Sequence, residues 1–103
     1  MSTHSGPEHL SGHHRDTLVR IFHQDTNYNV EWHDVVSLLG AVGTIEQQHD
    51  DMFVFRIGQE TQVFRRPSHK DIDGQQLVDL RRVLAGAGYA TVASELEDRG
   101  KEV

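Results

Sequence analysis

Apolar residues recur with helical spacing in three parts of the chain. In the first part, a short amphipathic segment predicts a helix that starts at Asp16, the expected capping residue, and ends near Asn27. The second part has apolar residues at i, i+3, i+4 and i+7, namely Trp32, Val35, Val36 and Leu39. Gly40 and Gly43 are expected to end this second helix.

The third helical pattern begins at Asp73, which can cap the helix while Gln76 reaches back to it in a capping box. Its apolar stripe consists of Leu77, Leu80, Val83 and Leu84. Gly86 or Gly88 is expected to end the helix. Residues 91–103 then predict one or two further amphipathic turns.

Between the second and third helices the pattern changes to alternation. The segment TIEQQH predicts an edge strand, and MFVFRI places Phe53, Phe55 and Ile57 on one face and Met52, Val54 and Arg56 on the other. The segment GQE predicts a turn, TQVFRR an antiparallel partner strand, and Pro67 the end of that strand.

These elements predict an α+β fold, in which a small three-stranded antiparallel sheet is covered on one face by helices. The expected organisation is a flexible, His-rich tail over residues 1–14, a single domain over 15–98 and a frayed end over 99–103. Such a sheet leaves its other face free. A binding surface and simple exposure to solvent are both consistent with a free face.

Composition and charge narrow the possible functions. The formal net charge of the 103 residues is −6, which argues against non-specific coating of nucleic acid. The absence of cysteine excludes disulfides, a thiolate nucleophile and a Cys-based zinc site, so a cytoplasmic location is expected. No apolar stretch is long enough to span a membrane. Residues 56–82 nevertheless hold six of the ten Lys and Arg residues, and form the only basic part of the chain.

Two stretches resemble the HicA family of type II toxin–antitoxin systems. NVEWHDVVSLLGAVG resembles the first core helix of that family, and VFRRPSHKDIDGQQLVDLRRVLAGAG resembles its third strand, its Pro-x-His turn and its last helix. The resemblance implies a dsRBD-like domain with an α-β-β-β-α core, here preceded by an extra helix. It also implies RNA as ligand, metal-independent endoribonuclease activity without a cofactor, and a HicB-like antitoxin as protein partner.

The chain departs from the family at the expected catalytic residue. HicA toxins resemble one another in a Gly-Ser-His triplet at the start of the second strand, and here these positions fall on Asp50, Asp51 and Met52. Two other histidines are candidates for a general base. A bulge or a register slip would bring His49 to the family position, and His69 lies in the turn before the last helix. The alternative role of His69 is to fix that turn by a hydrogen bond to a carbonyl group.

Six cations are candidates for contacts with phosphate groups: Arg56, Arg65, Arg66, Lys70, Arg81 and Arg82. Because adjacent strand residues face opposite sides, Arg65 and Arg66 share a groove only if the strand bends. The alternative is a solvated rim in which Asp71, Asp73 or Asp79 neutralises these cations.

Other side chains have simpler explanations. The tail histidines His4, His9, His13 and His14 match no metal motif, and Asp50 and Asp51 beside His49 suit a polar turn, so no metal site is expected. Core packing is favoured over base stacking for Trp32, Phe53 and Phe55, whereas Phe64 is left open. Two hypotheses remain: an RNA-binding and RNA-cleaving domain, or a non-catalytic protein-interaction module on the same fold.

Overall fold

The computed structural model describes residues 10–23 and 30–101, with side chains as far as residue 96. The helices are α1 (Gly12–Phe22), α2 (Trp32–Val42), α3 (Gly74–Gly86) and α4 (Tyr89–Lys101). The strands are β1 (Thr44–His49), β2 (Met52–Ile57) and β3 (Glu60–Arg65). The fold is therefore α+β, as predicted, and the three antiparallel strands follow α2 and precede α3 along the chain.

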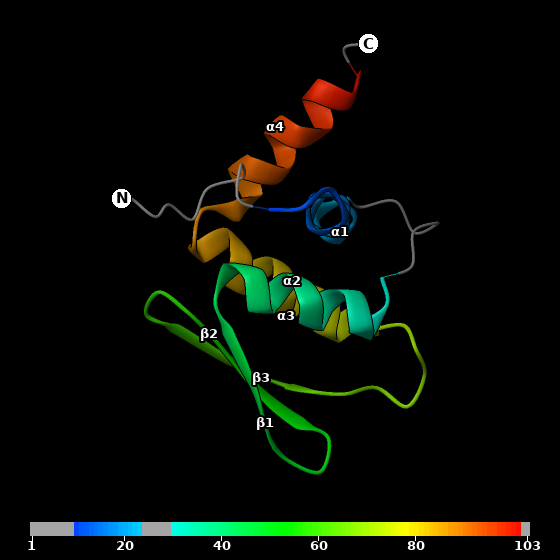
Figure 1. Cartoon of the computed structure of the whole chain (residues 1–103), viewed down its shortest axis with the longest axis vertical. Helices are drawn as coiled ribbons and strands as arrows, with labels where there is room; N and C mark the ends of the chain where they lie inside the picture. Colours follow the sequence, from blue (N-terminus) through cyan, green and yellow to red (C-terminus); the bar gives the residue numbers. More distant parts are fainter. Residues whose placement is uncertain (1–9, 24–29, 102–103) are drawn as a thin grey trace.

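The elements form layers (Figure 1). The sheet has the order β1-β2-β3, and α2 and α3 cover one face, with α2 packed against β1 and α3 against β3. Helices α1 and α4 lie on the side of α2 and α3 that is remote from the sheet, where α1 contacts both α2 and α4. None of the helices of residues 10–23 and 30–101 lies over the opposite face of the sheet. The prediction of a sheet covered on one face is confirmed.

Alternation divides the strands between the core and the free face. The rings of Phe55 and Phe64 and the side chain of Ile57 are buried beneath the helices, together with Leu39 of α2 and Leu84 of α3. Each fully buried aliphatic or aromatic side chain contributes about 1.5–3 kcal/mol to folding. Trp32 also lies in the core and meets Phe53 edge-to-face at 5.2 Å. Core packing of these aromatic residues is confirmed, and Phe64 belongs to the same core.

Two-residue turns join the strands. Ile57 pairs with Glu60 around Gly58, whose φ of 59° is the left-handed conformation that glycine adopts freely. His49 pairs with Met52 around Asp50, which adopts a φ of 53°, and a bulge interrupts the ladder between Gln47 and His49. The expected polar turn at Asp50 is thus present.

Helix α1 begins earlier than predicted. The side chain of Ser11, rather than that of Asp16, caps the helix by accepting a hydrogen bond from the backbone N–H of His14 at 3.2 Å. Leu10 is buried, so the domain starts before residue 15, and the boundary of the predicted tail is corrected accordingly. Within that tail, residues 1–9, including His4 and His9, lie outside the described residues.

The last two helices follow the sequence pattern more closely. Asp73 and Gln76 form the predicted capping box, and α3 ends at Gly86, followed by Gly88 with a φ of 94°. Helix α4 is longer than the one or two turns expected. Tyr89 and Ala93 are buried in the core, and Val92 and Leu96 pack against it, so this apolar stripe holds the helix against α1 and α3.

Candidate functional site

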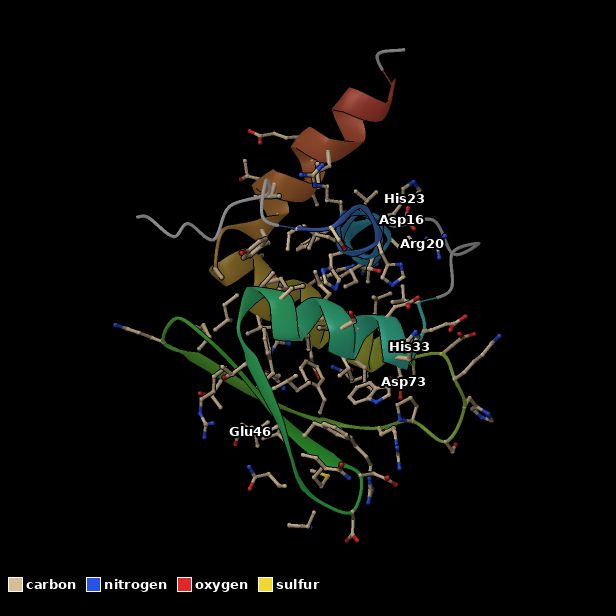
Figure 2. All side chains as sticks on the ribbon, viewed as in Figure 1. Asp16, Arg20, His23, His33, Glu46 and Asp73 are labelled. Carbon is tan, nitrogen blue, oxygen red and sulfur yellow. The ribbon has the colours of Figure 1, made fainter. Side chains whose placement is uncertain are left out.

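The free side of the sheet is here called the open face. Every second residue of each strand places its side chain on this face. Antiparallel register aligns these residues in rows across the strands. The first row is Thr44, Arg56 and Thr61, the second is Glu46, Val54 and Val63, and the third is His49, Met52 and Arg65. Figure 2 shows Glu46 beside β1, on the side away from α2.

The centre of the open face is apolar. Val54 and Val63 are directly opposite one another on β2 and β3, and Met52 follows on the same face of β2. Val63 is 48% exposed, whereas the large apolar residues of the opposite face lie under helices. The sequence signal for this patch was the second apolar set of MFVFRI, which makes β2 hydrophobic on both faces. Alternation assigns that set to one face of the strand, but the patch also needs Val63 of β3, which only the pairing of the two strands brings beside Val54.

Two arginines stand at opposite ends of this apolar centre. Arg56 lies in the first row and Arg65 in the third, and both are exposed. The two rows are four positions apart along β2, from Met52 to Arg56, which corresponds to about 13 Å along the strands. Within the described part of the chain, neither guanidinium forms a hydrogen bond or an ion pair. Their charges are therefore available to a ligand.

Three other predicted cations are paired with carboxylates. Arg66 donates to Asp51 at 2.7 Å, Arg82 to Asp79 at 3.4 Å, and Lys70 lies 3.8 Å from Glu31. These three cations therefore form the solvated rim with acidic neighbours that was the alternative to RNA contact. The partner of Arg82 is among the expected carboxylates, whereas those of Arg66 and Lys70 are not. Arg65 pairs with Met52 on the open face and Arg66 follows the end of β3, yet both residues border one shallow hollow beside the next loop.

Arg81 has a structural position. Its Nε donates to the carbonyl oxygen of Ile21 at 2.7 Å, and its Nη2 donates to that of His23 at 3.2 Å. These carbonyls belong to the C-terminal end of α1, where acceptors lack helical partners and a cation is favoured. The half-buried guanidinium thus joins α3 to α1, away from the open face. The six predicted cations are not brought together into one surface.

The two candidate histidines lie in different places. His49 is exposed at the end of β1, 3.7 Å from Asp50, and the bulge in β1 brings it opposite Met52. It therefore lies in one row with Arg65. His69 is exposed in the loop after β3, and its side chain makes no hydrogen bond or ion pair to any residue that the structure describes. The alternative role for His69, a hydrogen bond that fixes the turn, is absent from this loop.

Backbone hydrogen bonds fix the loop that carries His69. At its start, the N–H of Arg66 donates to the carbonyl oxygen of Asp51 at 2.7 Å. At its end, Trp32 N–H donates to Lys70 at 2.7 Å and Ile72 N–H donates to Val30 at 2.9 Å. This part of the chain is therefore primarily a junction between the sheet, α2 and α3. Beside it, a shallow hollow of about 320 Å³ is lined by Asp51, Arg65, Arg66, Pro67, Ser68, Asp73 and Gln76.

The described residues contain no cluster suited to a metal ion. Among the side chains of residues 10–23 and 30–96, no group of three or more His, Asp or Glu residues could hold a metal ion. His13 and His14 instead link α1 to α2, with Nε2 of His13 3.0 Å from Asp34 and Nε2 of His14 2.7 Å from Ser37 Oγ. No helix in the described ranges combines the length and apolar character needed to cross a lipid bilayer.

Comparison of the chain with protein-family models, with curated proteins and with solved structures gives no match. The fold and the open face define a small α+β domain with an apolar surface between two arginines, whose guanidinium groups pair with no residue in the described part of the chain.

Proposed function

We propose that this chain is a non-catalytic protein-interaction module that binds its partner on the open face of the sheet. The observation that carries the proposal is the apolar centre between Arg56 and Arg65, formed by the exposed Val63 and the half-buried Val54 and Met52. Interfaces between proteins favour an apolar, desolvated centre with arginine anchors at its margin. A partner that covers this surface removes apolar atoms from water and supplies acceptors for both guanidinium groups.

The distribution of the aromatic residues and cations supports a protein partner over RNA. Single-stranded nucleic acid is bound by exposed aromatic rings beside a positive groove. Phe53, Phe55 and Phe64 face the helices, and four of the six predicted cations are engaged with other residues of the chain. The overall charge of −6 further weakens attraction for a polyanion.

A photo-crosslinking experiment tests this proposal, and the chain provides a matched control. Val63 and Val78 are the same residue type and are 48% and 46% exposed, but Val63 lies on the open face and Val78 on α3. A photoreactive benzoylphenylalanine is placed at each position in turn, in cells that express the chain naturally. We expect a discrete protein adduct from position 63, none from position 78, and loss of the adduct when Arg65→Glu is added. Equal adducts from both positions, or none from position 63, would contradict the proposal.

RNA binding and cleavage by a HicA-like domain is the second candidate, because His49 and Arg65 share a row on the open face. In such a domain His49 would accept the proton of the 2′-hydroxyl, and Arg65 would stabilise the charge on the phosphate. A HicB-like antitoxin would then be the natural protein partner. This candidate predicts cleavage of single-stranded RNA in the presence of chelator, abolished by His49→Ala and retained in His69→Ala. Absence of cleavage, with no RNA binding at low salt, would exclude it.

A further inference from the structure

We infer that the partner presents an amphipathic α-helix whose apolar stripe is bordered on one margin by carboxylates. This inference rests on the proposed protein-binding function and concerns the same open face. It follows from the width of the sheet, the backbone groups that the face lacks, and the positions of Arg56, Arg65 and Glu46.

The width of the open face suits a single helix. Three strands with a spacing of about 4.8 Å place the outer two about 10 Å apart. An α-helix with its side chains is about 10–12 Å in diameter, so one helix covers the face from β1 to β3. Helices α2 and α3 already cover the opposite face, and a partner helix would complete a layer on each side of the sheet.

Backbone hydrogen bonding favours a helix over an extended peptide on this face. The N–H and C=O groups of a sheet lie in its plane, so they cannot pair with a peptide that lies across its surface. An extended segment would leave its own backbone groups without partners in the contact, whereas a helix pairs them internally.

Strand addition at the free edge of β1 is also disfavoured. The bulge between Gln47 and His49 interrupts the regular ladder, and Glu46 places a charge in the middle of a strand of six residues. Both features limit edge-to-edge pairing in natural sheets. The apolar surface for a partner is therefore the face, where Val54 and Val63 are paired, rather than the edge of β1.

Charge complementarity identifies the polar residues of the partner helix. Arg56 and Arg65 stand about 13 Å apart along the strands, which corresponds to about nine residues of helix. Carboxylates seven residues apart lie on the same margin of a helix, about 11 Å from one another, and the length of the arginine side chains spans the remaining difference. Glu46 lies on the other edge strand, in the row between the two arginines, so it directs the acidic margin of the helix toward β3.

The experiment titrates the isotope-labelled full chain with designed peptides and follows backbone amide shifts by NMR. The probe is a capped 18-residue helix of Ala, Gln, Leu and Glu, with Leu at i, i+3, i+4 and i+7, Glu along one margin of this stripe and Gln along the other. One control peptide replaces every Glu with Lys, and a second contains two central prolines that prevent helix formation. A single-stranded RNA oligonucleotide is the fourth titrant.

We expect the acidic helix to shift amides around Val54, Val63 and Arg65, with little change in α3. Arg65→Glu should weaken this binding roughly tenfold and give the Lys peptide a comparable gain, because the substitution reverses one contact charge. Arg82→Glu is the matched control, since Arg82 lies on α3, and it should leave the affinity unchanged.

Several outcomes would overturn the inference, and they separate it from the proposed function. Equal binding of the Glu and Lys helices at the open face would show that the partner need not be acidic. Equal binding of the proline peptide would show that the partner need not be helical. Either result would leave the open face as a docking surface. Absence of binding, or shifts confined to α3, would overturn the inference entirely, and the crosslinks from Val63 would then decide the proposed function separately. Tighter binding of RNA at the open face would overturn both and favour the second candidate. Shifts at the open face that depend on protein concentration alone would identify a second copy of this chain as the occupant.

Discussion

Replacing Arg81 with alanine is expected to destabilise the domain, because this side chain supplies two hydrogen bonds between α3 and α1. Its guanidinium donates to Ile21 at 2.7 Å and to His23 at 3.2 Å, and it is half-buried. Hydrogen bonds that involve a charged group contribute about 1.5–3 kcal/mol each. Since one side chain makes both bonds and its ordering entropy is lost only once, we expect a loss on the order of 2–4 kcal/mol in the free energy of unfolding.

Arg82 provides the control for Arg81. It is the neighbouring residue on α3, but its side chain is 69% exposed and lies 3.4 Å from Asp79 of the preceding turn. Surface pairs of this kind contribute about 0–1 kcal/mol, so Arg82→Ala should change stability little. Arg81→Lys should fall between, because an ammonium group cannot reproduce the geometry of the guanidinium group.

Urea denaturation measures this difference through the fluorescence of Trp32, which is buried in the core. With an m-value of about 1–1.5 kcal/mol/M, the midpoint of Arg81→Ala should fall by roughly 1.3–4 M. Equal midpoints for Arg81→Ala and Arg82→Ala would refute the structural role of Arg81. Arg81 would then return to the set of cations available for a ligand.

Three further predictions concern stability. A Cβ at Gly43 would overlap the carbonyl oxygen of Arg56, so Gly43→Ala should cost at least about 1–3 kcal/mol in urea denaturation. Gly40→Ala is its control, and it should stabilise α2 by up to about 1 kcal/mol, since the nearest atom to its Cβ would be 4.0 Å away; the opposite order of the two variants would contradict this account. Asp73→Ala should lower the free energy of unfolding by about 1 kcal/mol, because it removes the cap of α3. Asp73→Asn should recover most of that loss, and equal stability of Asp73→Ala and the wild type would contradict the role of the cap. Burial raises the pKa of Tyr89, so stability should be lost as the pH rises from about 10, where an unfolded tyrosine ionises, through the higher folded pKa. Tyr89→Phe should lack this alkaline loss in urea midpoints between pH 9 and 11, and an unchanged loss would refute the assignment.

The periodic elements of the fold could be predicted from the sequence because their side chains carry the pattern directly. TIEQQH and MFVFRI coincide with β1 and β2, and the cap of α3 lies at Asp73. The predicted start of α1 at Asp16 was wrong, because Ser11 and Asp16 can both cap a helix. Only the burial of Leu10 distinguishes the two positions. Local sequence does not contain that tertiary contact.

The candidate site was less predictable, because it depends on which partner each cation finds. Arg66 and Asp51 are 15 residues apart, and Arg81 reaches carbonyl groups about 60 residues away, so neither pairing leaves a local signal. Alternation assigned Arg65 and Arg66 to opposite faces, but the chain leaves the strand after Arg65 and both residues border one hollow. The sequence allows either a bulge or a regular ladder near His49. The bulge that brings His49 opposite Met52 is a backbone irregularity, and it leaves no periodic signature in the sequence.

The loop between β3 and α3 has a consequence for the order of folding. Its hydrogen bonds reach back to Asp51 in the first hairpin turn and to Val30 and Trp32 at the start of α2. Both of those elements must therefore be in position before the loop can close, and we expect it to form after the folding transition state. Weakening its anchors would then accelerate unfolding and leave the refolding rate nearly unchanged. The same connections make the loop, the hairpin and α2 open together rather than one at a time.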